Sequence, residues 1–117
     1  MLTGSNGLLG QKLIEKISRD HSFELIATSL GNCVVNSDNF KYYSLDVTDQ
    51  EKINQFVSKH LPDAIINTAA VTNVDYCEKN KVQCDNVNVK AVEYLSEICS
   101  KKNIHLVHIS SDFIFDG

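Results

Sequence analysis

Three glycines near the start of the sequence are spaced to bind a phosphate group. Gly4, Gly7 and Gly10 stand three residues apart, and a helical pattern follows at once. Gly4 permits a tight turn, Gly7 removes the side chain where a pyrophosphate would lie, and Gly10 lets a helix pack closely on a strand. The first N–H groups of that helix direct a partial positive charge at the anion. This GxxGxxG spacing is a variant of the dinucleotide-binding fingerprint, although three glycines that serve only turns and packing would look the same.

Small and polar residues also follow the short apolar runs farther along the chain. The positions at the ends of these runs are Ser29, Asp46, 67–72 and 110–112. Many NAD-binding domains place an acidic residue near the position of Ser29, where its carboxylate grips the ribose hydroxyls. Here Thr28 and Ser29 offer hydroxyl groups and no charge. The sequence therefore leaves the choice between NAD and NADP open.

Hydrophobic periodicity predicts the elements that must position these residues. Apolar residues recur at helical spacing in 7–18, 49–61 and 82–102, and strand-like apolar runs occupy 23–28, 41–45, 64–67 and 105–109. Thr48 and Glu51 fit a capping box at the start of the second helix, and Asn103 suits a left-handed turn after the last one. Strands that alternate with helices predict an α/β fold with a doubly wound parallel sheet, Rossmann-like. Every candidate site then lies at the carboxyl ends of strands, where such a sheet binds its ligand.

The strand that should precede the glycines is short. Only Met1 and Leu2 stand before Thr3, whereas a typical strand has about five residues. In a doubly wound sheet this strand lies at the centre, between its neighbours. We therefore expect a domain that is incomplete at this end and only marginally stable, because a shortened central strand leaves backbone polar groups unpaired.

Composition limits the classes of protein to consider. The 117 residues are 43% hydrophobic, which suits one globular domain or part of one. The net charge is −4 and the lysines are scattered, so nucleic acid is not an expected partner. No apolar run reaches the roughly 18 residues of a membrane span and no signal peptide is visible, so we expect a cytoplasmic protein without a membrane partner. Cys33, Cys77, Cys84 and Cys99 show neither CxxC nor a His at metal-binding spacing, so we expect reduced cysteines and no metal site.

Several stretches together resemble the extended short-chain dehydrogenase/reductase family, and within it the dTDP-4-dehydrorhamnose reductase branch. They are Thr3–Gly10, Asp46–Thr48, Asn67–Asp75, Glu78, Asn88 and Ser110–Gly117, and they run from one end of the chain to the other. The resemblance implies a Rossmann-like fold, NAD or NADP as the cofactor and a nucleotide-sugar ketone as the substrate. It also allows a homodimer.

The same resemblance implies a set of cofactor-binding positions. They are Gly4, Gly7, Leu8, Leu9, Gly10, Ser29, Asp46, Val47, Ala69, Ala70 and Val71. Residues 7–9 would meet the pyrophosphate through backbone N–H groups, and Ser29 would face the adenosine ribose. Residues 46–47 would contact the adenine, and residues 69–71 would pass beside the cofactor.

The resemblance implies roles for three further residues. Ser111 matches the catalytic Ser or Thr, whose hydroxyl hydrogen-bonds the substrate carbonyl, and Asp112 matches a residue beside the sugar substrate. Asn88 resembles a structural Asn of the active-site helix, although a polar helix residue that only faces solvent would look the same. Phe113 departs from the branch, which usually has Tyr there. The sequence also lacks a Tyr followed four residues later by Lys, the pair that carries the family's proton donor.

We therefore interpret residues 1–117 as the amino-terminal portion of an NAD(P)-binding Rossmann-like domain, incomplete at both ends and without the substrate-binding part. Such a fragment is expected to be inactive alone. One alternative is a non-catalytic regulatory subunit, similar to that of methionine adenosyltransferase, which binds a cofactor while it serves a partner enzyme. A flavodoxin-like or receiver domain would explain the alternating elements but not the glycines. A Tyr-x-x-x-Lys motif in the downstream coding sequence would distinguish the reductase from the regulatory subunit.

Overall fold

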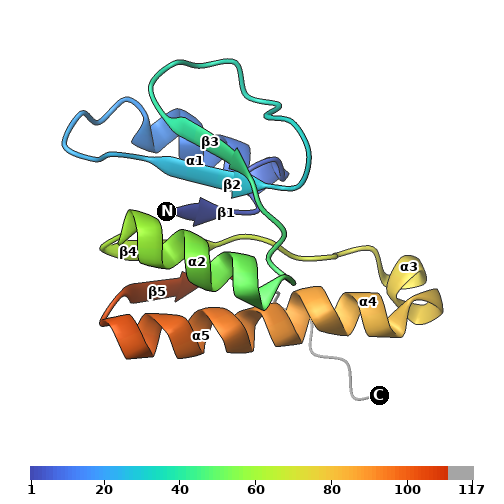
Figure 1. Ribbon diagram of the computed structural model, residues 1–117. Helices are drawn as coiled ribbons and strands as arrows, with labels where there is room; N and C mark the ends of the chain where they lie inside the picture. Colours follow the sequence, from blue (N-terminus) through green and yellow to red (C-terminus); the bar gives the residue numbers. More distant parts are fainter. Residues whose placement is uncertain (111–117) are drawn as a thin grey trace.

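The computed structural model describes residues 1–110, which form a five-stranded parallel sheet (Figure 1). The strands are β1 (Leu2–Thr3), β2 (Ile26–Ser29), β3 (Lys41–Ser44), β4 (Ala64–Asn67) and β5 (His105–His108). Their order across the sheet is β3-β2-β1-β4-β5, and each neighbouring pair is parallel. The strand order reverses beside β1, as the doubly wound architecture requires.

Helices cover both faces of this sheet. The helices of the described residues are α1 (Leu8–Ile17), α2 (Gln50–His60), α3 (Val74–Lys79), α4 (Lys81–Asp85), the π-helical turn η1 (Asn86–Lys90) and α5 (Ala91–Lys102), and of these α3 stands clear of the sheet (Figure 1). Helix α1 packs on one face through Ile14, whereas α2 and α5 pack on the other through Val57 and Leu95. Because side chains alternate along a strand, Ile65 of β4 joins the core under α2 and α5 while Ile66 packs against the core under α1. The predicted α/β fold is therefore confirmed.

Strand β1 has only two residues and lies at the centre of the sheet. Leu2 pairs with Ala27 of β2 on one side and with Ile66 of β4 on the other. Met1 extends the pairing, because its carbonyl accepts from the Ile66 N–H at 2.9 Å and its amino group donates to the Ala64 carbonyl at 2.8 Å. Burial lowers the pKa of that amino group. The prediction of a very short central strand is confirmed.

Strand β2 begins three residues later than predicted. Phe23 is 64% exposed, and its N–H donates to the Asp20 carbonyl at 3.2 Å, within a turn. The sequence pattern placed Phe23 in the strand because aromatic residues favour strands. Because the backbone N–H of Phe23 is hydrogen-bonded within the turn, Phe23 does not pair with a neighbouring strand.

The predicted capping box at helix α2 is wrong by one residue. The Thr48 hydroxyl donates to the Asp46 carboxylate at 2.7 Å, so Thr48 does not cap the helix. Asp49 is the N-cap instead, and its carboxylate accepts from the Lys52 N–H at 3.0 Å. Hydrogen bonds from Lys52 also lower the pKa of Asp49. Thr48 and Asp49 could both cap the helix. Because Asp46 accepts the hydrogen bond of the Thr48 hydroxyl, Asp49 takes the N-cap position.

The predicted helix 82–102 is a nearly continuous rod of α4, η1 and α5. It ends at Asn103, whose φ of 55° is the predicted left-handed cap. Helix α3 precedes the rod and was not predicted. Asn73 caps it by accepting a hydrogen bond from the Tyr76 N–H at 2.9 Å. Helix α3 has no buried residue, so it leaves no hydrophobic periodicity in the sequence.

Two of the four cysteines form a disulfide, which corrects the expectation that all are reduced. Cys77 of α3 and Cys84 of α4 are bonded, with their Cα atoms 5.6 Å apart. Cys33 and Cys99 are free, as expected. The bonded pair was missed because seven residues separate the two positions in the sequence and only the turn between α3 and α4 brings them together.

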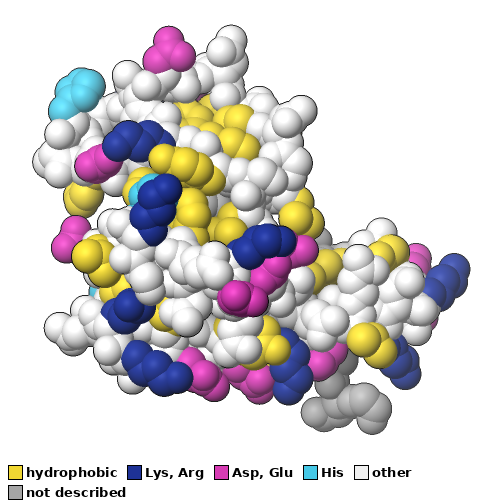
Figure 2. Space-filling view, in the orientation of Figure 1, with side chains coloured by type: hydrophobic (Ala, Val, Ile, Leu, Met, Phe, Trp, Pro, Cys, Tyr) yellow, Lys and Arg dark blue, Asp and Glu magenta, His cyan; other side chains and the backbone are white. Residues whose placement is uncertain are grey.

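Acidic and basic side chains are interspersed over the face shown in Figure 2. Ion pairs follow η1 and α5, including Lys90–Glu93 and Lys101–Glu97. Exposed pairs of this kind contribute little to stability. The lower part of this view, over η1 and α5, is therefore a mixed-charge surface.

Candidate functional site

The loop between β1 and α1 is built on the first predicted glycine. Gly4 has a φ of +69°, and a side chain there would overlap the backbone of Ala69 in the loop after β4. The Ser5 N–H donates to the Thr28 carbonyl at 3.1 Å, and the Gly7 N–H donates to the Gly4 carbonyl at 3.0 Å. The tight turn expected at Gly4 is confirmed, since only glycine combines this φ with so close an approach.

The other two glycines differ in what the fold requires of them. A Cβ at Gly10 would lie 2.5 Å from the Gly4 carbonyl oxygen and 2.7 Å from the Ser5 Cα, so α1 can pack on the loop only with glycine there. A Cβ at Gly7 would meet only the Gly4 oxygen, at 3.2 Å, and the φ of Gly7 is an ordinary −69°. Packing therefore requires glycine at position 10, whereas at Gly7 a side chain would make one tight contact with the backbone.

The start of α1 lacks a cap. Gly7 is the N-cap residue and has no side chain to accept a hydrogen bond. The Gln11 N–H donates to the Gly7 carbonyl at 2.9 Å. Within residues 1–110, the N–H groups of Leu8, Leu9 and Gly10 have no hydrogen-bond acceptor. Open N–H groups at a helix start, beside a residue without a side chain, fit a phosphate group.

Asn6 joins the glycine loop to the loop after β2. Its amide nitrogen donates to the Asn32 carbonyl at 2.9 Å and to the Leu30 carbonyl at 3.1 Å, and its oxygen accepts from the Val34 N–H at 3.2 Å. These contacts place the end of β2 beside the start of α1. The sequence analysis missed Asn6, because its partners lie 24 to 28 residues away and the residue type alone gave no signal.

Asp46 and Val47 follow β3 at the same edge of the sheet. The Asp46 carboxylate accepts from the Thr48 N–H at 2.8 Å as well as from its hydroxyl. Val47 is buried in the core under α2 and α5. Of these two residues only Asp46 is polar, and one of its carboxylate oxygens stabilises the turn to Thr48.

A buried amide organises the ends of β1, β4 and β5. The Asn67 side-chain oxygen accepts from the Thr3 hydroxyl at 2.5 Å and from the Ala69 N–H at 3.2 Å. Its amide nitrogen lies 3.1 Å from Nδ1 of His108. An amide nitrogen only donates, so Nδ1 of His108 accepts and neutral His108 carries its proton on Nε2. Asn67 thus fixes both the loop after β4 and the orientation of His108.

Asn88 clamps the loop after β4 from the helical side. Its oxygen accepts from the Val71 N–H at 2.8 Å, and its nitrogen donates to the Val71 carbonyl at 2.9 Å. Asn88 belongs to the π-helical turn η1, and such turns occur frequently at functional sites. The structural role implied by the family resemblance therefore fits the geometry better than a polar residue that only faces solvent.

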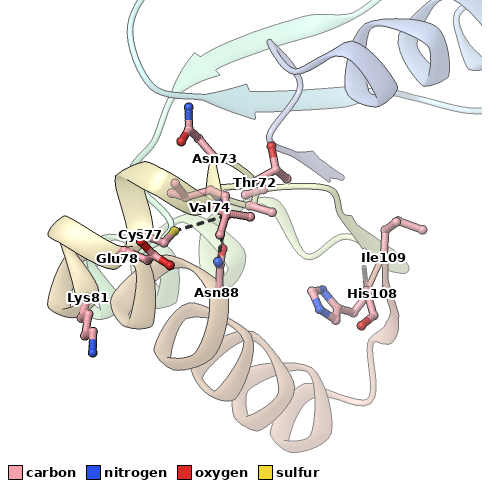
Figure 3. A pocket seen from close by; sticks show the side chains of 13 residues that line it. Thr72, Asn73, Val74, Cys77, Glu78, Lys81, Asn88, His108 and Ile109 are labelled. Carbon is pink, nitrogen blue, oxygen red and sulfur yellow. Dashed lines mark hydrogen bonds between the residues drawn. The ribbon is translucent and has the colours of Figure 1, made fainter. Parts of the chain in front are cut away.

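A cavity of about 780 Å³ opens beside this loop (Figure 3). His108 and Ile109 stand on one side of it, and Glu78 and Lys81 on the other. The full lining is Ala69–Val74, Cys77, Glu78, Lys81, Asn88 and His108–Ser110. The cavity therefore joins the predicted cofactor loop to the end of β5.

The predicted residues gather at one edge of the sheet. They are Gly4–Gly10 after β1, Ser29 at the end of β2, Asp46 after β3, Ala69–Val71 after β4 and Ser110 after β5. All five strands are parallel, so their carboxyl ends share this edge. The convergence predicted from the sequence is confirmed.

Two predicted site residues, Ser111 and Asp112, lie outside the described residues 1–110. Within the described part of the chain, no group of three or more His, Cys, Asp or Glu side chains could hold a metal ion. None of the helices described there is long and apolar enough to cross a lipid bilayer.

Comparison with known proteins places the chain in a family. The model of the RmlD substrate binding domain family matches residues 1–117. This chain belongs to that family. The dTDP-4-dehydrorhamnose reductase of Aggregatibacter actinomycetemcomitans is 30% identical over 117 residues, which are 100% of this chain and 36% of that protein. A probable low-salt glycan biosynthesis reductase of Haloferax volcanii is 31% identical over 123 residues, covering 99% of this chain and 38% of that protein.

A solved structure agrees with both the family and the fold. The crystal structure of a hypothetical dTDP-4-dehydrorhamnose reductase from Sulfolobus tokodaii is 34% identical, with a TM-score of 0.80, and the match covers 99% of this chain and 40% of that one. The resemblance to this reductase branch is confirmed. The chain spans well under half the length of these relatives. They give no support to a regulatory subunit similar to that of methionine adenosyltransferase.

Proposed function

We propose that this chain is the cofactor-binding part of an NAD(P)-dependent reductase that acts on a nucleotide-sugar ketone. The observation that carries the proposal is Gly7, a glycine that packing demands less strictly than Gly4 or Gly10, at a helix start whose N–H groups are open. A pyrophosphate at residues 7–9 accounts for both facts, because it needs close backbone approach and N–H donors.

The remaining cofactor contacts follow the carboxyl edge of the sheet. Ser29 would face the adenosine ribose, and Asp46, with the backbone of Val47, would contact the adenine. Ala69, Ala70 and Val71 would pass beside the cofactor, where small side chains leave room for a ligand across the sheet. Ser29 has no charge to repel a 2′-phosphate, so both NADH and NADPH are acceptable ligands of this site.

The bound dinucleotide would supply the hydride that reduces the ketone. Ser111 would donate a hydrogen bond to the carbonyl oxygen, and Asp112 would contact the sugar. An unactivated hydroxyl is a poor acid, so Ser111 cannot supply the proton that this oxygen needs. We propose that the family's Tyr–Lys pair, which residues 1–117 lack, supplies it from outside this sequence.

The names of the relatives support the substrate class. One is a dTDP-4-dehydrorhamnose reductase and another a probable reductase of glycan biosynthesis, and both match nearly the whole chain. Their length beyond the match has room for a sugar-binding part and a proton donor.

Titration of the chain with NADH and NADPH, followed by amide NMR, tests the proposal. We expect the largest shifts at Leu8, Leu9, Ser29 and Ala69, and we expect Gly7→Val to abolish binding by filling the phosphate space. Circular dichroism of the variant shows whether it is folded. A folded Gly7→Val protein with unchanged dinucleotide affinity would refute the proposal, as would shifts confined to the opposite edge of the sheet.

The catalytic part needs its own assay. Residues 1–117 should not reduce dTDP-4-dehydrorhamnose with either cofactor, whereas a chain extended by its downstream coding sequence should. Turnover by residues 1–117 at a rate near that of the extended chain would show that the proton donor has been misplaced.

A further inference from the structure

The disulfide between Cys77 and Cys84 joins two short helices that are otherwise held very differently. Helix α3, which carries Cys77, has no buried residue. Cys84 is buried, and its helix α4 runs directly into η1 and α5, whose Ala91 and Leu95 are fully buried in the core. The disulfide therefore ties a segment without core contacts to one that is anchored firmly.

The other contacts of α3 are local and polar. Asn73 caps its first turn, the Cys77 N–H donates to the Asn73 carbonyl at 3.0 Å, and the Tyr76 hydroxyl donates to the Gln83 side chain. Segments with few buried apolar contacts open at low free-energy cost. A covalent link that limits their freedom consequently has a large effect on their order.

Helix α3 is also one wall of the cavity beside the cofactor loop. Val74, Cys77 and Glu78 line it from α3, together with the preceding Asn73 (Figure 3). The Cys77 Sγ lies 3.8 Å from the Val71 carbonyl oxygen, the atom that accepts a hydrogen bond from the Asn88 amide. The disulfide thus lies in the cavity wall, next to the loop segment that Asn88 holds.

We propose that Cys77 and Cys84 are a reversible redox site whose state determines whether this wall of the cavity is held in place. In the disulfide form α3 is fixed against α4. In the dithiol form α3 keeps only its local hydrogen bonds and opens readily. This inference goes beyond the proposed function and does not depend on it.

The reaction is thiol–disulfide exchange with a small thiol such as glutathione. Residue Cys77 is half-buried whereas Cys84 is buried, so the incoming thiolate attacks Cys77, and the Cys84 sulfur leaves and takes up a proton. A second glutathione thiolate then attacks the glutathione sulfur of the mixed disulfide, and Cys77 leaves and is protonated. Two glutathione molecules are oxidised to one glutathione disulfide, and two protein thiols are formed.

The chain itself, equilibrated in glutathione buffers from fully oxidised to fully reduced, provides the test. Alkylation after denaturation, read by mass spectrometry, should rise from two labels on Cys33 and Cys99 to four labels in a single transition. Hydrogen exchange of the Cys77 and Asn80 amides should be at least about tenfold faster in the reduced form. Exchange of β4 and α5 should not change.

Serine variants provide the matched controls. Cys84→Ser should exchange rapidly in α3 at every glutathione ratio. The double variant Cys33→Ser/Cys99→Ser should keep the full redox response, because Cys33 lies outside α3 and α4, and burial raises the pKa of the Cys99 thiol and keeps it protonated. Four labels at every ratio would overturn the proposal. Equal exchange of α3 in the oxidised and reduced wild-type chain would overturn it as well, whatever the variants do.

Discussion

Replacing Gly7 with Asp should separate the stability of the fold from its ability to bind a dinucleotide. Gly7 has the extended conformation of an N-cap residue, with φ −69° and ψ 164°. An Asp there can accept from the open N–H groups of Leu9 or Gly10. Asp improves on Gly at an N-cap by a few tenths of a kcal/mol, and its charge gains about 0.3–1 kcal/mol from the helix dipole. The contact of the new Cβ with the Gly4 oxygen, at 3.2 Å, offsets part of this.

The effect on binding should have the opposite sign and be larger. The Asp carboxylate would occupy the N–H groups that a pyrophosphate needs, and that loss costs about 0.3–1 kcal/mol. It would also repel the phosphate, since two like charges about 4 Å apart cost about 1 kcal/mol in water and about 4 kcal/mol near a protein surface. Together these effects predict an affinity loss from about tenfold to several thousandfold.

Isothermal titration calorimetry with NADH and NADPH, beside thermal unfolding, measures both quantities. Gly7→Asn is the matched control, because it caps the helix without a charge and should lose an intermediate amount of affinity. Asn39→Asp adds the same charge at an exposed position before β3, at the opposite edge of the sheet, and should bind normally. A Gly7→Asp protein that unfolds at the wild-type temperature or higher and binds with wild-type affinity would refute a pyrophosphate at the start of α1. Marked destabilisation would show that the N-cap reasoning is wrong.

Three further substitutions test other parts of the structure. Ser29→Asp should favour NADH over NADPH by about tenfold or more, because the carboxylate repels the 2′-phosphate, whereas the native chain should discriminate by less than about 100-fold in competition binding. Asn88→Ala should lower the free energy of unfolding by about 1–2 kcal/mol and speed hydrogen exchange at Val71, because both hydrogen bonds of the clamp are lost. Asp49→Ala should destabilise the chain at neutral pH in denaturant titrations. Hydrogen bonds from Lys52 hold the pKa of Asp49 below its usual 3.8, so its contribution is present above pH 3.8 and is lost as the pH falls through the folded-state pKa; an undiminished difference in acid would contradict this.

The architecture was predictable because it follows from patterns that are local in the sequence. Ile65 and Ile66 form part of a short apolar run, with Ile65 buried on one face of the sheet and Ile66 partly buried on the other, which is typical of a central parallel strand. The helical rod shows its apolar face in Ala91, Leu95 and Ile98. Once the strands are known to be parallel, their carboxyl ends must meet, so the position of the candidate site follows from topology alone.

The details that the sequence did not predict depend on contacts between distant or weakly patterned segments. Helix α3 has no buried residue, so the sequence shows no hydrophobic periodicity there. The disulfide could not be predicted either, because one of its cysteines, Cys77, belongs to α3. The tautomer of His108 depends on the Asn67 amide, 41 residues away in the sequence, and the Ala69 N–H fixes the orientation of that amide by donating to its oxygen. Short-range rules predict elements well, but they cannot decide how side chains from three strands share hydrogen bonds.

The position of β1 also determines when the sheet can form during folding. Leu2 and Thr3 are made before the other four strands, yet half of their pairing is with Ile66 and Asn67, 64 residues later. At a synthesis rate of about 5–20 residues per second, β1 waits about 3–13 s for β4 to be made. Closing so long a loop is entropically costly and slows folding. Strand β2 is made before β4, so β1 can pair with β2 first. Strand β5 joins the sheet through β4, and β4 joins it by pairing with the free side of β1.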